Sequence, residues 1–138
     1  MERRLVPNKV GGVKPRSLRF RFYPQGTSTT PLTSVAGTLR DPGGFIDNVT
    51  RTGTAGVFTV TLRDPAFRIV GGSGVAQVVA NNVGMNVEFG TMTEGSASPA
   101  TAVVRLMVAT TATDLAANTN HSVLCTLDIE DSGAAGVA

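Results

Sequence analysis

The sequence predicts an all-β protein: a jelly-roll-like antiparallel β-sandwich with an extended basic N-terminal arm. The chain has 138 residues, including eighteen Val and eighteen Thr, whose β-branched side chains fit a pleated strand better than a helix. Sixteen Gly and seven Pro supply frequent turns. Between these turns lie eight or nine short segments that could form strands, a spacing typical of a sandwich or jelly roll. A closed barrel is the main alternative.

The first expected strand, at residues 17–23, has an apolar face and a basic face. Leu18, Phe20 and Phe22 alternate with Arg19 and Arg21. Side chains two residues apart on a strand point the same way, so this alternation predicts that the arginines face away from the core.

A hairpin is expected next, because two strand-like segments flank a glycine-containing reversal. The segments are residues 45–52 and 57–63, and Gly53-Thr54-Ala55-Gly56 lies between them. Further strands are expected at residues 32–39, 67–70, 75–80, 83–89, 101–110 and 121–130. Only residues 114–120 leave room for a helical turn.

The charge is unevenly divided along the chain and suggests three regions. Residues 1–40 carry eight Arg or Lys and one carboxylate, a net of +7, whereas residues 41–138 carry four against nine, a net of −5. We therefore expect a basic arm at residues 1–16, a sandwich domain at 17–131 and a flexible tail at 132–138.

The basic N-terminal region is the strongest functional signal, and it predicts docking on an acidic protein surface. Arginine outnumbers lysine ten to two in the chain, and arginine suits fixed bidentate contacts with carboxylates. Nucleic acid is not the expected partner, because residues 1–17 contain no aromatic side chain for base stacking. A solvated tail without a partner is the plain alternative. The candidate partner-binding residues are Arg3, Arg4, Lys9, Lys14, Arg16, Arg19 and Arg21.

No set of residues predicts catalysis, and no catalytic, metal-binding or cofactor-binding residue is assigned. His121 and Cys125 lie four residues apart on one strand face, about 13 Å at 3.3 Å per residue, too far for a hydrogen bond. Asp128 and Glu130 share a strand face, as paired glycosidase carboxylates do, but a solvated face is the simpler interpretation. Gly72-Ser73-Gly74 lacks the third glycine of a dinucleotide loop, so a tight turn or bulge is expected there.

Cys125 is the only cysteine, which excludes an internal disulfide and favours synthesis and assembly inside a cell. Arg3 and Arg4 are followed by only two apolar residues before Pro7, so no signal peptide is expected. Arg105 interrupts the longest apolar run, so membrane association is not expected.

Two stretches resemble decoration, or cement, proteins on the heads of tailed bacteriophages. Residues 49–62 (VTRTGTAGVFTVTL) are similar to a hairpin of that family, and residues 114–118 with 128–132 are similar to its C-terminal end. The resemblance implies a jelly-roll-like sandwich, a homodimer, no catalytic residues and no cofactor. It also implies binding outside an icosahedral shell across joints between major capsid protein subunits, in a virion assembled in the host cytoplasm.

Two other function classes remain open. A tail-fibre or carbohydrate-binding module is expected to expose Trp or Tyr, and this chain has no Trp and one Tyr. A small enzyme has only Asp128 and Glu130 in its favour.

Overall fold

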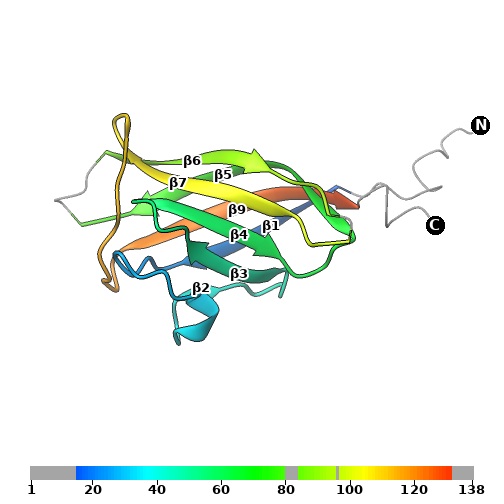
Figure 1. Ribbon diagram of the computed structural model, residues 1–138, viewed down its shortest axis with the longest axis horizontal. Coiled ribbons are helices and arrows are strands. Elements are labelled where there is room, and N and C mark those ends of the chain that lie inside the picture. The colour runs from blue at the N-terminus through cyan, green and yellow to red at the C-terminus, as the bar shows by residue number, and fades with distance from the viewer. Residues whose placement is uncertain (1–14, 80–83, 96, 132–138) are drawn as a thin grey trace, which may run out of the picture.

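The protein is a sandwich of two antiparallel β-sheets, as the sequence predicts (Figure 1). The computed structural model describes residues 15–79, 84–95 and 97–131. The first sheet has the strand order β2-β1-β9-β5, and the second has the order β3-β4-β7-β6 with β8 beside β7. The prediction of an all-β sandwich is confirmed, and the finer jelly-roll description stays a prediction.

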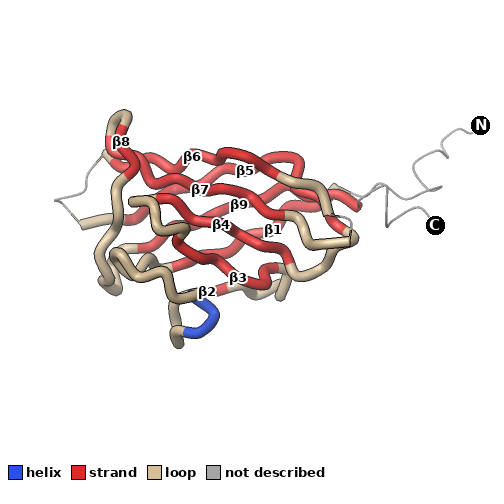
Figure 2. Tube along the Cα trace, in the orientation of Figure 1, coloured by secondary structure: helices blue, strands red, loops and turns tan. Residues whose placement is uncertain are grey.

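Strands make up almost all of the regular structure among the described residues, with a single 3-10 turn, η2, as the exception (Figure 2). The elements are β1 Arg16–Phe22, η2 Leu32–Ser34, β2 Leu39–Arg40, β3 Ile46–Arg51, β4 Val57–Leu62, β5 Phe67–Gln77, β6 Met85–Met92, β7 Thr101–Val108, β8 Thr111–Ala112 and β9 Ser122–Asp131.

The alternation predicted for the first strand is confirmed in β1. Leu18, Phe20 and Phe22 are buried, while Arg19 is exposed and Arg21 is half-buried. β1 lies along the whole of β9, with Phe20 opposite Cys125 in the register. The two arginines therefore belong to the outer face of the first sheet.

The predicted hairpin is also confirmed, as β3 and β4 pair in antiparallel register. Gly53 and Gly56 in its turn have φ values of 96° and 67°, in the region that favours glycine. Glycine is also needed at position 56 for lack of space, because a Cβ there would lie 2.5 Å from the backbone nitrogen of Thr113. The turn is thereby packed against the segment that follows β8.

The strand expected at residues 32–39 is wrong. Residues 32–34 form η2, and only Leu39 and Arg40 pair with β1. The Thr38 hydroxyl donates toward the carbonyl oxygens of Leu32 and Val35, at 2.7 and 2.8 Å, which stabilises a compact loop instead of an extended strand. The helical turn considered for residues 114–120 is absent, since that segment has no helix.

The glycine-rich turn expected between residues 70 and 75 is wrong as well, because β5 runs unbroken from Phe67 to Gln77. A shift in register between Ile69 and Gly71 marks an irregularity, which fits the bulge alternative. A Cβ on Gly72 would lie 2.9 Å from Phe89, and one on Gly74 would lie 2.7 Å from Val87. The glycines thus let β6 of the second sheet approach β5 closely.

The core lies between the two sheets and is built from their inward-facing side chains. Phe22 on β1 and Phe58 on β4 meet across the sandwich with ring centroids 5.1 Å apart. Leu106 on β7 and Leu127 on β9 are fully buried. Full burial of such a side chain contributes roughly 1.5–3 kcal/mol to the stability of the fold. This apolar layer therefore holds the two sheets together.

The division into arm, sandwich and tail stays a prediction, and two of its boundaries lie close to the ends of described strands. Arg16 was assigned to the arm but begins β1, and β9 ends at Asp131, the predicted end of the sandwich. Residues 1–14 of the predicted arm and the predicted tail at residues 132–138 lie outside the described residues.

Candidate functional site

The structure brings three arginines together on the outer face of the first sheet. Arg21 lies opposite Arg40 on β2, and Arg19 lies two residues before Arg21 on the same face of β1. Like charges directly opposite each other on neighbouring strands are destabilising. No carboxylate among the described residues forms an ion pair with any of the three. We call these three residues the arginine cluster.

Only Arg21 of the cluster is held by other side chains. Its Nη1 donates to Ser122 Oγ at 2.7 Å and to Gln77 Oε1 at 3.3 Å. Both acceptors are neutral, so the guanidinium is positioned without losing its charge. Arg19 and Arg40 are exposed, which leaves their donors open to solvent or to a partner.

Apolar side chains lie beside the arginine cluster on the same face. Leu124 on β9 is opposite Arg21, and Val75 on β5 is opposite Leu124. Val75 is 68% exposed and Val70, nearer the start of β5, is 51% exposed. A shallow depression of about 210 Å³ opens between the arginines, Pro42 and Leu124. The face thus combines positive charge with uncovered apolar surface, a combination found where proteins bind one another.

The other predicted partner-binding residues do not join this cluster. Arg16 lies on the same side of β1 as the buried Leu18. Its Cζ lies over the ring of Phe67, 5.3 Å from the ring centroid. Arg3, Arg4, Lys9 and Lys14 lie outside the described residues. Of the seven candidates, Arg19 and Arg21 are brought together, and Arg40 is the residue that sequence reasoning missed.

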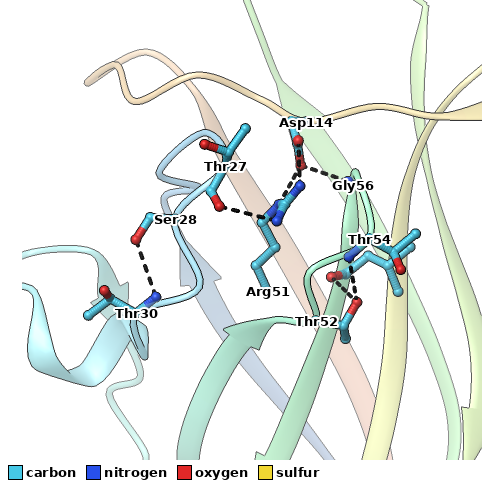
Figure 3. Close-up of polar contacts among 9 residues, drawn as sticks. Thr27, Ser28, Thr30, Arg51, Thr52, Thr54, Gly56 and Asp114 are labelled. Carbon is cyan, nitrogen blue, oxygen red and sulfur yellow. Dashed lines mark hydrogen bonds and ion pairs between the residues drawn. The ribbon is translucent and has the colours of Figure 1, made fainter.

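Another arginine, Arg51, is buried and pairs with Asp114 (Figure 3). Its Nε and Nη2 donate to the two carboxylate oxygens of Asp114 at 2.7 and 2.8 Å, and its Nη1 donates to the Thr27 carbonyl at 3.1 Å. The Gly56 N–H also donates to Asp114, at 2.7 Å. Arg51 and this backbone donor lower the pKa of the Asp114 carboxyl. The pair therefore ties three separate loops together.

The sequence did contain a signal for this pair. Arg51 lies two residues after the buried Val49 on β3, so the strand period puts its charge on the inner face. A charge at a core position requires a partner, although no local pattern distinguishes Asp114 from the other nine acids of the chain.

Both carboxylates considered for glycosidase chemistry form hydrogen bonds with neighbouring side chains. Glu130 pairs with Arg68, whose Nε donates at 2.7 Å, and Arg68 also contacts Glu94. Asp128 accepts a hydrogen bond from the Ser17 hydroxyl at 2.8 Å. The Arg68–Glu130 contact holds the start of β5 to the end of β9, and the Ser17–Asp128 bond links β1 to β9.

His121 and Cys125 occupy structural positions. His121 is buried, with Nδ1 2.8 Å from the Ala116 carbonyl oxygen, and it precedes β9. Cys125 is buried inside β9, where desolvation raises the pKa of its thiol to about 12. No group of three or more His, Cys, Asp or Glu side chains in the described part of the chain is placed to hold a metal ion. None of the helices there could span a membrane.

Comparisons with models of protein families, with curated proteins and with solved structures find no match to this chain.

Proposed function

We propose that this chain is a non-enzymatic structural protein of a virion that decorates the outer surface of an icosahedral phage capsid. In this proposal it bridges major capsid protein subunits and so resists their separation. The observation that carries the proposal is the arginine cluster, whose charges face no described carboxylate and lie beside exposed Val75. A partner surface with carboxylates would complement both features.

The stretch that resembles decoration proteins supports the same proposal. Residues 49–62 form the β3–β4 hairpin and its turn, so the resembling motif is a real structural unit of this protein. The proposed partner is the major capsid protein of the same virus.

The free energy of exposed ion pairs is too small for charge alone to give stable attachment to a capsid. An exposed arginine–carboxylate pair contributes about 0.2–1 kcal/mol, so three such pairs bind weakly. Burial of Val75 and Leu124 would add to this, at about 25 cal/mol per Å² of apolar surface. Two linked copies would add more, because the second contact becomes intramolecular. We therefore include in the proposal an isologous homodimer as the binding unit.

The experiment is co-sedimentation of the purified protein with capsids that lack it. The double variant Arg19→Glu/Val75→Asp changes the outer face without touching the core, and we expect at least about tenfold weaker capsid binding. Raising the salt concentration from about 50 to 300 mM should weaken wild-type binding, because screening reduces exposed charge contacts.

The control is Arg63→Glu, which makes the same arginine-to-glutamate change as Arg19→Glu at an exposed arginine directly after β4. It should bind capsids as wild type does, and circular dichroism should be unchanged for both variants. Equal capsid binding by wild type and the double variant would exclude this face as the docking surface. Failure of the wild type to sediment with capsids would exclude decoration itself.

A further inference from the structure

A pocket of about 460 Å³ lies at one end of the sandwich, separate from the centre of the outer sheet face. Its walls are three segments far apart in sequence: residues 23–25 after β1, residues 36–40 before and within β2, and residues 117–119 before β9. In Figure 1 the loop after β1 and the loop leading into β9 meet at the same end of the molecule. The volume is within the range of small-molecule sites, about 300–1,000 Å³.

Hydrogen bonds hold two opposite walls of the pocket. The Tyr23 N–H donates to the Thr38 carbonyl at 2.8 Å, and the Thr38 hydroxyl is itself bonded inside the loop. On the opposite wall, buried His121 contacts the Ala116 carbonyl through Nδ1 and donates its backbone N–H to Asn118 at 3.0 Å. A ligand would therefore meet a largely preformed site, which lowers the ordering cost of binding.

The polar groups that line the pocket are varied and include a single cation, Arg40. The Nε2 of Gln25 donates to the carbonyls of Tyr23 and Pro24, so its Oε1 stays free as an acceptor. The Oδ1 of Asn118 accepts from the Asn120 N–H at 2.7 Å, so its amide NH₂ stays free to donate. Thr119 adds a hydroxyl that both donates and accepts.

The only tyrosine of the chain, Tyr23, lines this pocket. A tyrosine presents an apolar ring together with a polar tip, so it can pack on the C–H face of a ligand and hydrogen-bond its edge. The lining also contains Ala36 and Ala117, which have small side chains, and Gly37, which has none, so a ring has room to approach. Gly37 has a φ of 77°, so its place in the wall favours glycine on backbone grounds as well.

We propose that this pocket binds a saccharide that carries a carboxylate, such as a sialic acid or a hexuronic acid. Arg40 would pair with the carboxylate, the amides of Gln25 and Asn118 with Thr119 would bond the hydroxyls, and the Tyr23 ring would contact the sugar ring. A simple inorganic anion fits less well, because one cation stands among several neutral donors and acceptors. The proposal adds a recognition function to capsid decoration and does not require it, although Arg40 belongs to both the pocket and the arginine cluster.

The test is a glycan array followed by NMR titration of the ¹⁵N-labelled full chain. The array should contain matched pairs, sialyllactose beside lactose and glucuronate-terminated beside glucose-terminated oligosaccharides. We expect binding to the acidic member of at least one pair and at least tenfold weaker binding to its neutral partner. Titration with that acidic glycan should shift the amide signals of residues 23–25, 36–40 and 117–119.

Two variants and a control make the result specific. Arg40→Gln removes the cation, and Asn118→Asp keeps the Oδ1 that accepts from Asn120 while it replaces the donor with a negative charge. Each should weaken acidic-glycan binding at least about tenfold. Arg19→Gln, on the outer sheet face, should bind the glycan as wild type does.

Three results would overturn the proposal: no binding of any acidic glycan at millimolar concentration, equal binding of neutral and acidic partners, or signal shifts confined to β1 and β9. Failure of this proposal is distinguishable from failure of capsid decoration. Arg19→Glu/Val75→Asp tests the decoration surface alone, whereas Asn118→Asp tests the pocket alone.

Discussion

Two regions of this molecule use arginine in opposite ways. Arg51 is only 8% exposed, and its charge is neutralised by Asp114 within the fold. The arginine cluster on the outer face of the first sheet has no described carboxylate within ion-pair distance, and two of its members lie opposite each other. The first arrangement stabilises the protein by itself. The second costs some stability until something else supplies the negative charge.

The difference separates an arginine that serves folding from arginines that are open to a partner. A neutralised arginine is accounted for by folding, so its loss should change stability and leave binding intact. An arginine without a counter-ion is not accounted for by folding, so its loss should change binding without lowering stability. Substitutions at each kind of arginine, or at its partner, test this separation.

Replacing Asp114 with Asn should lower the melting temperature by about 5–15 °C. The variant keeps the shape of the side chain but leaves Arg51 without its counter-ion, and it weakens the bond to the Gly56 N–H. Differential scanning calorimetry measures the effect. The control Asp47→Asn removes an exposed carboxylate at the start of β3 and should move the melting temperature by no more than about 2 °C.

Capsid binding of Asp114→Asn, measured where the variant is folded, should equal that of wild type. An unchanged melting temperature would contradict the assignment of this pair to folding. A specific loss of capsid binding would contradict the separation of the two kinds of arginine.

The stability advantage of wild type over Asp114→Asn should depend on pH. The pKa of Asp114 in the folded protein lies below its ordinary value of 3.8, chiefly because of the hydrogen bonds from Arg51. A carboxyl with a lowered pKa contributes stability that is complete above the unfolded-state pKa and is lost as the pH falls through the folded-state pKa. The advantage should therefore be constant from pH 7 to 5 and shrink below 3.8.

Urea denaturation of both proteins at pH 7, 5 and 3 measures this advantage. The two free energies of unfolding should be closest at pH 3. A gap that widens on acidification would reverse the sign and exclude Asp114 as the responsible group.

Deleting residues 1–14 should have the smallest effect and should act on binding. This segment carries Arg3, Arg4, Lys9 and Lys14 against Glu2, a net charge of +3, and the deletion keeps β1 intact. We expect an unchanged melting temperature and capsid binding weakened by about three- to tenfold at low salt. Co-sedimentation measures the binding, and a variant with Arg3 and Arg4 changed to Gln should show part of the loss.

A truncated protein that binds capsids as tightly as wild type would exclude the predicted arm from docking. Capsid docking would then be attributed to the arginine cluster alone. A large loss of stability would instead indicate that these residues belong to the folded domain.

Local patterns predicted the sandwich because strand formation depends on side chains close together in sequence. The alternation of Leu18, Arg19 and Phe20 was sufficient to predict an exposed basic face on β1, and it is confirmed. The same reasoning failed at Gly72 and Gly74, because the space they leave is filled by Val87 and Phe89 of the other sheet. Glycines that accommodate a distant strand look, in the sequence, like glycines that make a turn.

By itself, the sequence determined that this chain folds as paired strands with an apolar and a polar side. The reason is that apolar and polar side chains alternate with a period of two among residues adjacent in the sequence. Only the tertiary structure decided which charges meet. Arg51 finds Asp114 sixty-three positions away, and Arg40 comes to lie beside Arg21 through a loop that was expected to be a strand. Such contacts depend on strand order and loop path, which neighbouring residues do not encode.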